Sequence, residues 1–321
     1  MKKIIYSFIF LALTVLLLVF PRESFYLALS GLNLWFQKMV PTLFPFMILS
    51  GMMIRLNLTE KFMVLFNPIL KPLFRLRLAP LYAIAAGFLC GFPMGARIVA
   101  DLYGHQKISK NEAQYLLSFV NNIGPIYFLS FALPLINLDS SPALSPKLSP
   151  AFSPTILSPT LLLPTILFGM YGIPLCYGLF LRYAVYRNKI TPVIYTPERK
   201  TASMGFLKAL DDSITAGIEG ITKLGGYMIF FNMLNIIPHR FINNGLAQGF
   251  LSGMLEISGG LKALGSKIPL LSLTLLVFGG FSCLAQTYSC IAKTDLSIKS
   301  YFIHKIILTL LALGYYAFIL G

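Results

Sequence analysis

The sequence predicts an all-α, polytopic integral membrane protein. Only 12% of its 321 residues are charged, 56% are hydrophobic, and the mean hydropathy is +0.76. A water-soluble domain has about 25% charged residues, so this chain lacks the polar side chains that would cover a soluble globule of its size. Apolar runs long enough to cross a bilayer recur along the chain. These observations exclude an ordinary soluble enzyme and a disordered protein.

The charge balance is basic, and we interpret it as a signal of membrane topology. The chain has 26 Lys and Arg against 11 Asp and Glu, a formal net charge of +15. In a soluble protein this excess would suggest nucleic-acid binding. In a membrane protein, however, Lys and Arg gather in cytoplasmic loops and set the orientation of the helices. We therefore expect membrane lipid, and no nucleic acid, as a partner.

Neither a metal site nor a cofactor is predicted. The four cysteines, Cys90, Cys176, Cys283 and Cys290, lie in apolar runs and form no Cys-x-x-Cys pair, which argues against zinc and against disulfides. The sequence also lacks the GxSxG, HExxH and P-loop motifs. We expect no catalytic residue and no enzyme activity.

The first half of the chain is predicted to hold an N-terminal helix and one repeat. Residues 1–24 form the first transmembrane helix, because residues 4–20 carry no charge and no small-residue cleavage site follows them. Repeat 1 covers residues 25–138. It starts with an apolar span and continues through an amphipathic, proline-broken stretch at 56–78 that we expect to lie along the membrane surface.

A broken, re-entrant hairpin is predicted at residues 78–96 of repeat 1. Its centre, GFLCGFPMG, combines glycines with a proline and disfavours a continuous helix. Such backbone is tolerated in a membrane only where it is buried in protein or faces a wet cavity. Further on, Ser109 and Glu112 form a capping box that opens a predicted helix over residues 113–138.

The second half is predicted to hold a linker, a connecting span and a second repeat. Residues 139–160 repeat Ser-Pro at short intervals and cannot bury a core, which is typical of an extended linker. Residues 161–208 hold a connecting transmembrane helix and a basic loop. Repeat 2 covers residues 209–321, and its glycine-broken segment at 268–292 is predicted to be a second re-entrant hairpin.

The distribution of Lys and Arg favours inverted repeats. With the N-terminus inside, a hairpin at 78–96 makes repeat 2 start on the face opposite to repeat 1. Several cations of the second half oppose this topology, since it places them outside: Arg240, Lys262, Lys267, Lys293, Lys299 and Lys305. An extra crossing within 148–181 or 241–265 is the alternative that removes the conflict.

Four blocks of residues resemble a known family. They are GFLCGFPMGAR (87–97), SFVNNIGP (118–125), LEISGG (255–260) and FGGFSCLAQ (278–286). These blocks are similar to those of the YlbJ-type sporulation integral membrane proteins. That family is grouped with nucleoside-recognition gate domains and is similar in plan to concentrative nucleoside transporters. In this chain Cys90 and Phe92 stand where the family pattern has serine and tyrosine.

The resemblance implies a bacterial membrane protein that acts in endospore formation. It implies transport of dipicolinate, a small organic anion, across the outer forespore membrane. The alternatives are a nucleoside-type solute transporter and a non-transporting scaffold for spore-envelope (cortex) assembly. Oligomer formation is compatible with each of these functions.

The candidate substrate site lies at the two broken segments and an asparagine pair. Half-helix N-termini at mid-membrane favour an anionic group, and Arg97 can add two parallel hydrogen bonds to a carboxylate. Its alternative role is an interfacial arginine paired with Asp101. The predicted substrate-binding residues are Cys90, Gly91, Pro93, Arg97, Asn121, Asn122, Ser282 and Gln286.

Glu256 is the candidate for a coupling ion or proton. It is the one acidic residue between Arg240 and Asp295, and an ionisable group inside a membrane domain is a functional candidate by default. The alternative is a surface glutamate on an amphipathic stretch. For Asn121 and Asn122, the alternative to substrate binding is hydrogen bonding between helices.

Overall fold

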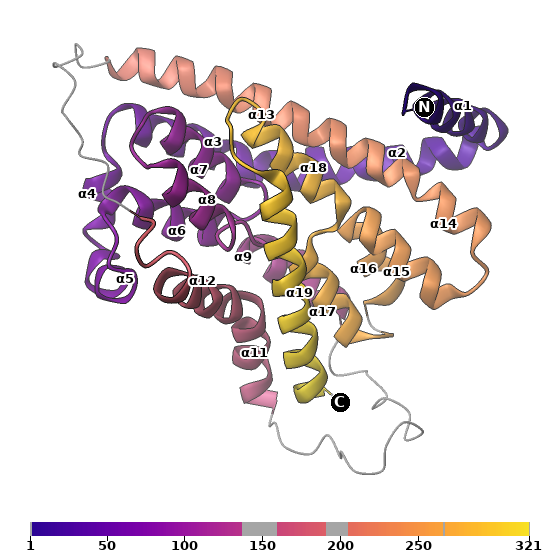
Figure 1. The fold of residues 1–321 in the computed structure, drawn as a ribbon. Helices are drawn as coiled ribbons and strands as arrows, with labels where there is room; N and C mark the ends of the chain where they lie inside the picture. Colours follow the sequence, from indigo (N-terminus) through magenta and orange to yellow (C-terminus); the bar gives the residue numbers. More distant parts are fainter. Residues whose placement is uncertain (1, 137–158, 191–204, 266, 321) are drawn as a thin grey trace.

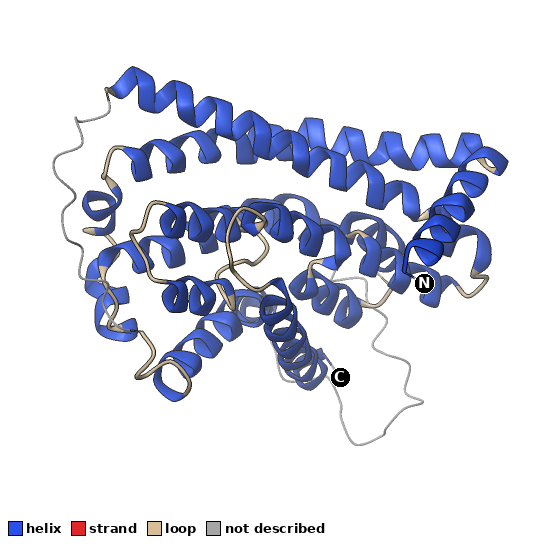
Figure 2. Cartoon of the chain, turned by 45° about the horizontal axis from the view of Figure 1, so that its top comes forward, coloured by secondary structure: helices blue, strands red, loops and turns tan. Residues whose placement is uncertain are grey.

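The computed structural model describes residues 2–136, 159–190, 205–265 and 267–320. Within these ranges the chain is all-helical and contains no β-strand, which confirms the predicted all-α class (Figure 1 and Figure 2). Nearly all of the predicted linker at 139–160, and residues 191–204 of the basic loop, lie outside the described residues.

Two long helical elements form one layer of the molecule. α1 (Lys2–Val19) meets, at 102°, a rod made of α2 (Pro21–Leu34), η1 (Trp35–Met39) and α3 (Val40–Arg55). Pro21 begins the rod, where a missing N–H costs no helical hydrogen bond. α13 (Phe206–Leu234) packs along the rod, and Figure 2 shows the two lying side by side.

Small residues bring α13 and the rod into close contact. Gly31 lies against the backbone at Met228, and Gly225 lies against the indole of Trp35. The Trp35 Nε1 donates a hydrogen bond to the Ile221 carbonyl at 2.8 Å. Close approach of this kind lets helices gain dispersion energy where the hydrophobic effect contributes little.

The predicted break in repeat 1 occurs at Gly91–Pro93. Two short helices, α4 (Thr59–Met63) and α5 (Asn67–Phe74), precede it. α6 (Leu78–Cys90) and α7 (Met94–Gly104) then fold into a helical hairpin and pack against each other. The second arm is therefore longer than the 78–96 segment that the sequence predicts.

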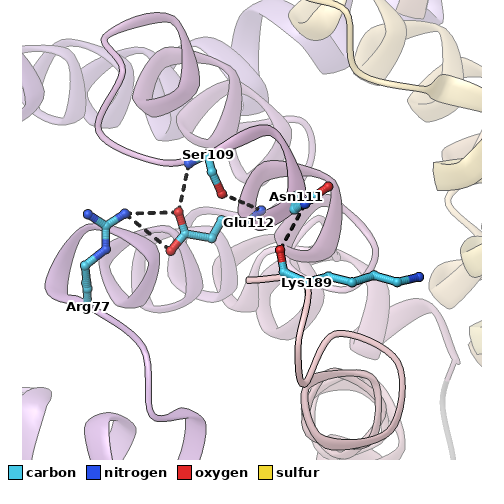
Figure 3. Close-up of polar contacts among 5 residues, drawn as sticks. All are labelled: Arg77, Ser109, Asn111, Glu112 and Lys189. Carbon is cyan, nitrogen blue, oxygen red and sulfur yellow. Dashed lines mark hydrogen bonds and ion pairs between the residues drawn. The ribbon is translucent and has the colours of Figure 1, made fainter. Parts of the chain in front are cut away.

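A partly buried ion pair anchors this hairpin to the next helix, α8 (Lys110–Leu117). The Arg77 guanidinium bonds to the Glu112 carboxylate at 3.0 Å, and Glu112 also accepts from the Ser109 backbone N–H at 2.8 Å (Figure 3). The Ser109 hydroxyl accepts from the Glu112 N–H, which confirms the predicted capping box. The Asn111 amide donates to the Lys189 carbonyl at 2.9 Å (Figure 3). This hydrogen bond attaches residue 189, in the second half of the chain, to α8.

The predicted continuous helix over 113–138 is wrong. α8 ends at Leu117, residues 118–124 leave the helical conformation, and the chain resumes as α9 (Pro125–Tyr127), η2 (Phe128–Ala132) and α10 (Leu133–Ile136). Pro125 has no N–H to continue a helix and disfavours the helical conformation at Gly124. Gly124 also lies against the backbone of Cys90 and Gly91, a contact that a regular helix would not permit.

The second half begins with the connecting span that the sequence predicts. α11 (Pro159–Leu167), η4 (Phe168–Gly172) and α12 (Ile173–Ala184) form it. After α13, the elements up to the C-terminus are α14 (Ile236–Phe241), α15 (Gly245–Leu255), α16 (Ile257–Leu264), α17 (Pro269–Phe278), α18 (Gly280–Ile291) and α19 (Ile298–Leu320).

The second hairpin lies at a different place from the predicted one. Residues 268–292 do not fold back, because α17 and α18 form a single span, Pro269–Ile291, that is interrupted at Gly279 and Gly280. The chain reverses instead at Glu256, where α15 and α16 pack against each other with Gly253 touching Gly260. Both halves thus contain a helical hairpin followed by an interrupted helix. The inverted relation between the halves stays a prediction.

Several helices of the described residues are long and apolar enough to cross a membrane. Three qualify individually: Leu162–Ala184, Pro269–Ile291 and Ile298–Leu320. The number rises to five if each sharply bent pair, Lys3–Val19 with Pro21–Arg55 and Asn67–Phe74 with Leu78–Cys90, counts as one span. These spans agree with the predicted polytopic membrane protein.

A polar clasp joins the α7–α8 corner to the loop before α19. The Asp295 carboxylate accepts from Lys110 Nζ at 2.7 Å and from the Tyr103 hydroxyl at 2.8 Å. These hydrogen bonds, with that of Lys110 the stronger, hold the pKa of Asp295 below its usual range. A carboxyl group with a lowered pKa stabilises the fold above its unfolded-state pKa, and that contribution is lost as the pH falls through the folded-state pKa.

We expect Asp295→Asn to lower the melting temperature slightly at neutral pH, because an exposed ion pair contributes little. The difference from wild type should shrink as the pH falls below about 4 and disappear below the lowered folded-state pKa, where the carboxyl is protonated in both states. Thermal unfolding followed by tryptophan fluorescence measures this. Asp211→Asn, which removes the same charge from the exposed start of α13, should show no such pH dependence, and an equal effect would contradict the clasp.

Candidate functional site

The tip of the α6–α7 hairpin presses against the non-helical residues 118–124. Gly91 adopts a φ of 84°, and its Cα lies against Gly124. A Cβ at Gly95 would lie 2.5 Å from the Val120 carbonyl oxygen. Three glycines therefore allow two broken segments to meet backbone to backbone, with no side chain between them.

Asn121 is the centre of a buried polar cluster at this contact. Its Oδ1 accepts from the Ala96 N–H at 3.3 Å, in the first turn of α7. Its Nδ2 donates to Thr287 on α18 at 2.8 Å and lies 3.2 Å from the Tyr301 hydroxyl on α19. The alternative role of Asn121, hydrogen bonding between helices, is therefore present in the structure.

Lys305 is a buried cation that the sequence analysis did not select. It is 3% exposed, and its Nζ donates to the Asn121 carbonyl at 3.0 Å and lies 4.4 Å from the centre of the Phe92 ring. The topology argument counted it among the cations on the outer side of the membrane, whereas in the structure its side chain is buried within the protein. The signal that could have identified it is its place in the apolar run of residues 301–320, where it is the one lysine.

Two cavities adjoin the hairpin tip. The outer cavity, about 210 Å³, is lined by five charged residues: Arg97, Asp101, Glu219, Lys223 and Lys293. The inner cavity, about 70 Å³, is mostly apolar, and its polar lining includes Cys90, Tyr127, Glu256 and Gln286. Leu224 and Gln286 line both cavities and separate them. A charged cavity and a mostly apolar one therefore lie next to each other beside α13.

Arg97 has the alternative role that the sequence suggested, a pair with Asp101, and substrate binding by Arg97 stays a prediction. It lines the outer cavity, and its Nε lies 3.8 Å from an Asp101 carboxylate oxygen. Its Nη2 also donates to the Ala216 carbonyl on α13 at 2.5 Å. These contacts hold the guanidinium at the cavity wall while leaving donors for a ligand.

Comparison with known proteins finds one similar curated protein. The sporulation integral membrane protein YlbJ of Bacillus subtilis (strain 168) is 26% identical over 331 residues, which cover 93% of this chain and 78% of that protein. This similarity over nearly the whole chain supports membership of the YlbJ-type family. Together with the apolar spans, this similarity supports an integral membrane protein. No family model matches the chain, and no solved structure matches it.

The four blocks that resemble the YlbJ-type family all lie at breaks between helices. Block 87–97 holds the α6–α7 tip, 118–125 is the non-helical segment, 255–260 holds the α15–α16 tip, and 278–286 spans the interruption before α18. Each block contributes residues to the inner cavity. The blocks are thus far apart in the sequence and adjacent in space.

Four of the eight predicted substrate-binding residues line these cavities: Cys90, Pro93, Arg97 and Gln286. Cys90 lines the inner cavity, Pro93 lines the outer one, and Gln286 lines both. Ser282 is buried and accepts from the Gln286 side chain at 3.0 Å. Asn122 lines neither cavity, because its amide bonds to the Phe119 carbonyl at 2.6 Å and supports the local turn. Substrate binding by these residues stays a prediction.

Glu256 is 6% exposed and forms the N-cap of α16. The alternative role, a surface glutamate, is therefore wrong. The sequence pattern misled because the stretch around Glu256 looks amphipathic, whereas in the fold it forms a packed hairpin against α13 and α18.

Proposed function

We propose that this protein transports a small organic anion across a membrane, and that the anion is dipicolinate, moved across the outer forespore membrane during sporulation. The observation that carries the proposal is the convergence of four helix breaks on one chamber, with a charged cavity at its mouth. The similarity to a sporulation integral membrane protein supports the cellular setting.

The charges of the outer cavity favour an anion. Arg97, Lys223 and Lys293 outnumber the carboxylates of Asp101 and Glu219. Glu219 is bonded to Lys223 at 2.6 Å and lies 3.5 Å from Lys293. The cavity therefore keeps one net positive charge, which favours a carboxylate, and guanidinium and ammonium groups bind carboxylates with strong hydrogen bonds.

The inner cavity requires a conformational change for transport. At about 70 Å³ it holds only a few water molecules, so the anion passes only if the hairpin tips move apart. Broken helices that meet near the middle of a membrane are the elements that move in transporters with alternating access.

Uptake of labelled dipicolinate into proteoliposomes tests the proposal. We expect uptake above that of empty vesicles when an ion gradient is imposed. If no ion gradient produces such uptake by correctly inserted protein, the proposed function is wrong.

We expect Arg97→Ala to reduce dipicolinate uptake, mainly through a higher KM, by about 10- to 100-fold, the range for loss of a charge-assisted hydrogen bond. Arg97→Lys should retain part of the activity, because it keeps the charge and loses the planar fork. Arg187→Ala, at an exposed site away from both cavities, is the control. A wild-type KM in Arg97→Ala would contradict this role.

A nucleoside-type solute is the second candidate. It is favoured by the apolar lining of the inner cavity, in which Glu256 is the one charged residue. Uridine uptake that is insensitive to Arg97→Ala, in vesicles that take up no dipicolinate, would support this candidate over the first.

A further inference from the structure

The carboxylate of Glu256 is buried, and among the described residues its hydrogen-bond donors are neutral groups. It accepts from the Ser258 N–H at 2.8 Å, from the Ser258 hydroxyl and from the Gly259 N–H at 3.4 Å. The Asn232 side chain also lies within hydrogen-bonding range. None of the ion pairs among the described residues includes Glu256. A buried carboxylate without a basic partner calls for a bound cation or a proton.

Two residues that lie against Gly259, in the first turn of α16, each have a neutral oxygen with no hydrogen-bond partner within the described part of the chain. The Asn235 Oδ1 and the Ser252 Oγ are both buried and unpaired, and the two residues are only 2% and 1% exposed. Leaving such groups unpaired costs about 1–3 kcal/mol each. Each of these two oxygens would therefore be stabilised by a ligand that it could bind.

The first turn of α16 brings these groups together. A Cβ at Gly259 would lie 2.9 Å from the Asn235 amide nitrogen and 3.9 Å from the Ser252 Cβ. The same Gly259 donates its N–H to Glu256. Asn235 comes from the α13–α14 junction and Ser252 from the last turn of α15. Three separate elements thus supply a carboxylate, an amide and a hydroxyl around one glycine.

We propose that Glu256, Asn235 and Ser252 bind a small monovalent cation of the Na⁺ class. Carboxylate, amide carbonyl and hydroxyl oxygens are hard ligands that suit alkali and alkaline-earth cations rather than transition metals. A single carboxylate balances one positive charge, so a monovalent ion leaves the buried site neutral. The described residues contain no cluster of His, Cys, Asp and Glu that would hold a transition metal.

This site would tie cation binding to the inner cavity. Glu256 lines that cavity, while Asn235 belongs to the end of α13. A bound cation would fasten the α15–α16 tip to α13, and release of the cation would free the tip. The coupling role rests on the proposed transport function, whereas cation binding itself does not.

Thermal unfolding of the purified, detergent-solubilised protein tests the site. The melting temperature is measured in NaCl, KCl and choline chloride at constant ionic strength. We expect a saturable increase with Na⁺ and none with choline, because a ligand that binds only the folded state stabilises it. Glu256→Gln and Ser252→Ala should each raise the apparent Kd for Na⁺ by at least about tenfold, which corresponds to one lost ligand.

Ser272→Ala is the matched control. Ser272 also has a buried, unpaired hydroxyl, but it lies on α17, so its removal should leave the Na⁺ dependence unchanged. If Glu256→Gln fails to fold, Gly259→Ala provides the test, since the added methyl group would crowd the Asn235 amide and weaken Na⁺ binding.

Several outcomes would overturn the cation site. They are no Na⁺ dependence in the wild type, an unchanged Na⁺ dependence in Ser252→Ala and Gly259→Ala, and stabilisation by acid pH in place of Na⁺, which would indicate a protonated Glu256. Na⁺-dependent stabilisation in a protein that takes up no dipicolinate would support the cation site and contradict only the proposed function.

Discussion

Gly91→Ala is expected to destabilise the protein more than any other single methyl group added at the hairpin tip. Gly91 has φ 84° and ψ −168°, a conformation that is essentially restricted to glycine. A Cβ there would overlap the backbone nitrogen and Cα of Gly124. Neither backbone can yield without separating the α6–α7 tip from residues 118–124. Strain and overpacking together amount to roughly 3–5 kcal/mol.

Unfolding in detergent, by heat or denaturant, measures this effect. Gly104→Ala is the matched control, because Gly104 ends the same hairpin and a methyl group added there would meet open space, while alanine favours the helix. A melting temperature for Gly91→Ala that equals that of Gly104→Ala would contradict the contact between the two broken segments.

Lys305→Met is expected to abolish anion transport and to leave the protein folded. The buried ammonium has one carbonyl acceptor, on Asn121, and one aromatic face, that of Phe92. Replacing a buried charge with an apolar side chain of similar volume is often neutral or stabilising by about 1–4 kcal/mol. Lys305 therefore contributes little to stability, while its charge lies where the hairpin tip meets residues 118–124.

The measurement pairs a melting curve with proteoliposome uptake of dipicolinate. We expect Lys305→Met to melt at or above the wild-type temperature while its uptake falls to the level of empty vesicles. Lys299→Met, at the exposed start of the same helix, should transport normally. Normal transport by Lys305→Met, or a large loss of its stability, would show that Lys305 serves packing alone.

Local composition predicted one of the two main helix breaks in the first half and missed the other, at residues 118–124. The glycines and proline of 87–95 coincide with the α6–α7 tip, and the Ser109–Glu112 pair caps α8 as expected. These signals are local, because a residue without a Cβ or without an N–H changes the helix at its own position.

Local composition did not predict which breaks reverse the chain. Gly279 and Gly280 interrupt a helix that continues in the same span, whereas Glu256, with one flanking leucine and one flanking isoleucine, marks a reversal. The chain can reverse only where the helices before and after the break pack against each other. The close contact of Gly253 with Gly260 allows α15 and α16 to do so. Such a contact depends on how two helices pack, and the number of glycines in a segment does not predict it.

The shortage of charge was enough to establish a helical membrane protein, because 12% charged residues cannot cover a soluble surface of this size. Which of the charged residues are buried was decided only by the tertiary structure. Lys305 and Glu256 are buried beside broken segments, while Asp295 stays exposed in a clasp. Hydropathy averages over neighbours in the sequence, but burial depends on neighbours in space, and those are supplied by helices from distant parts of the chain.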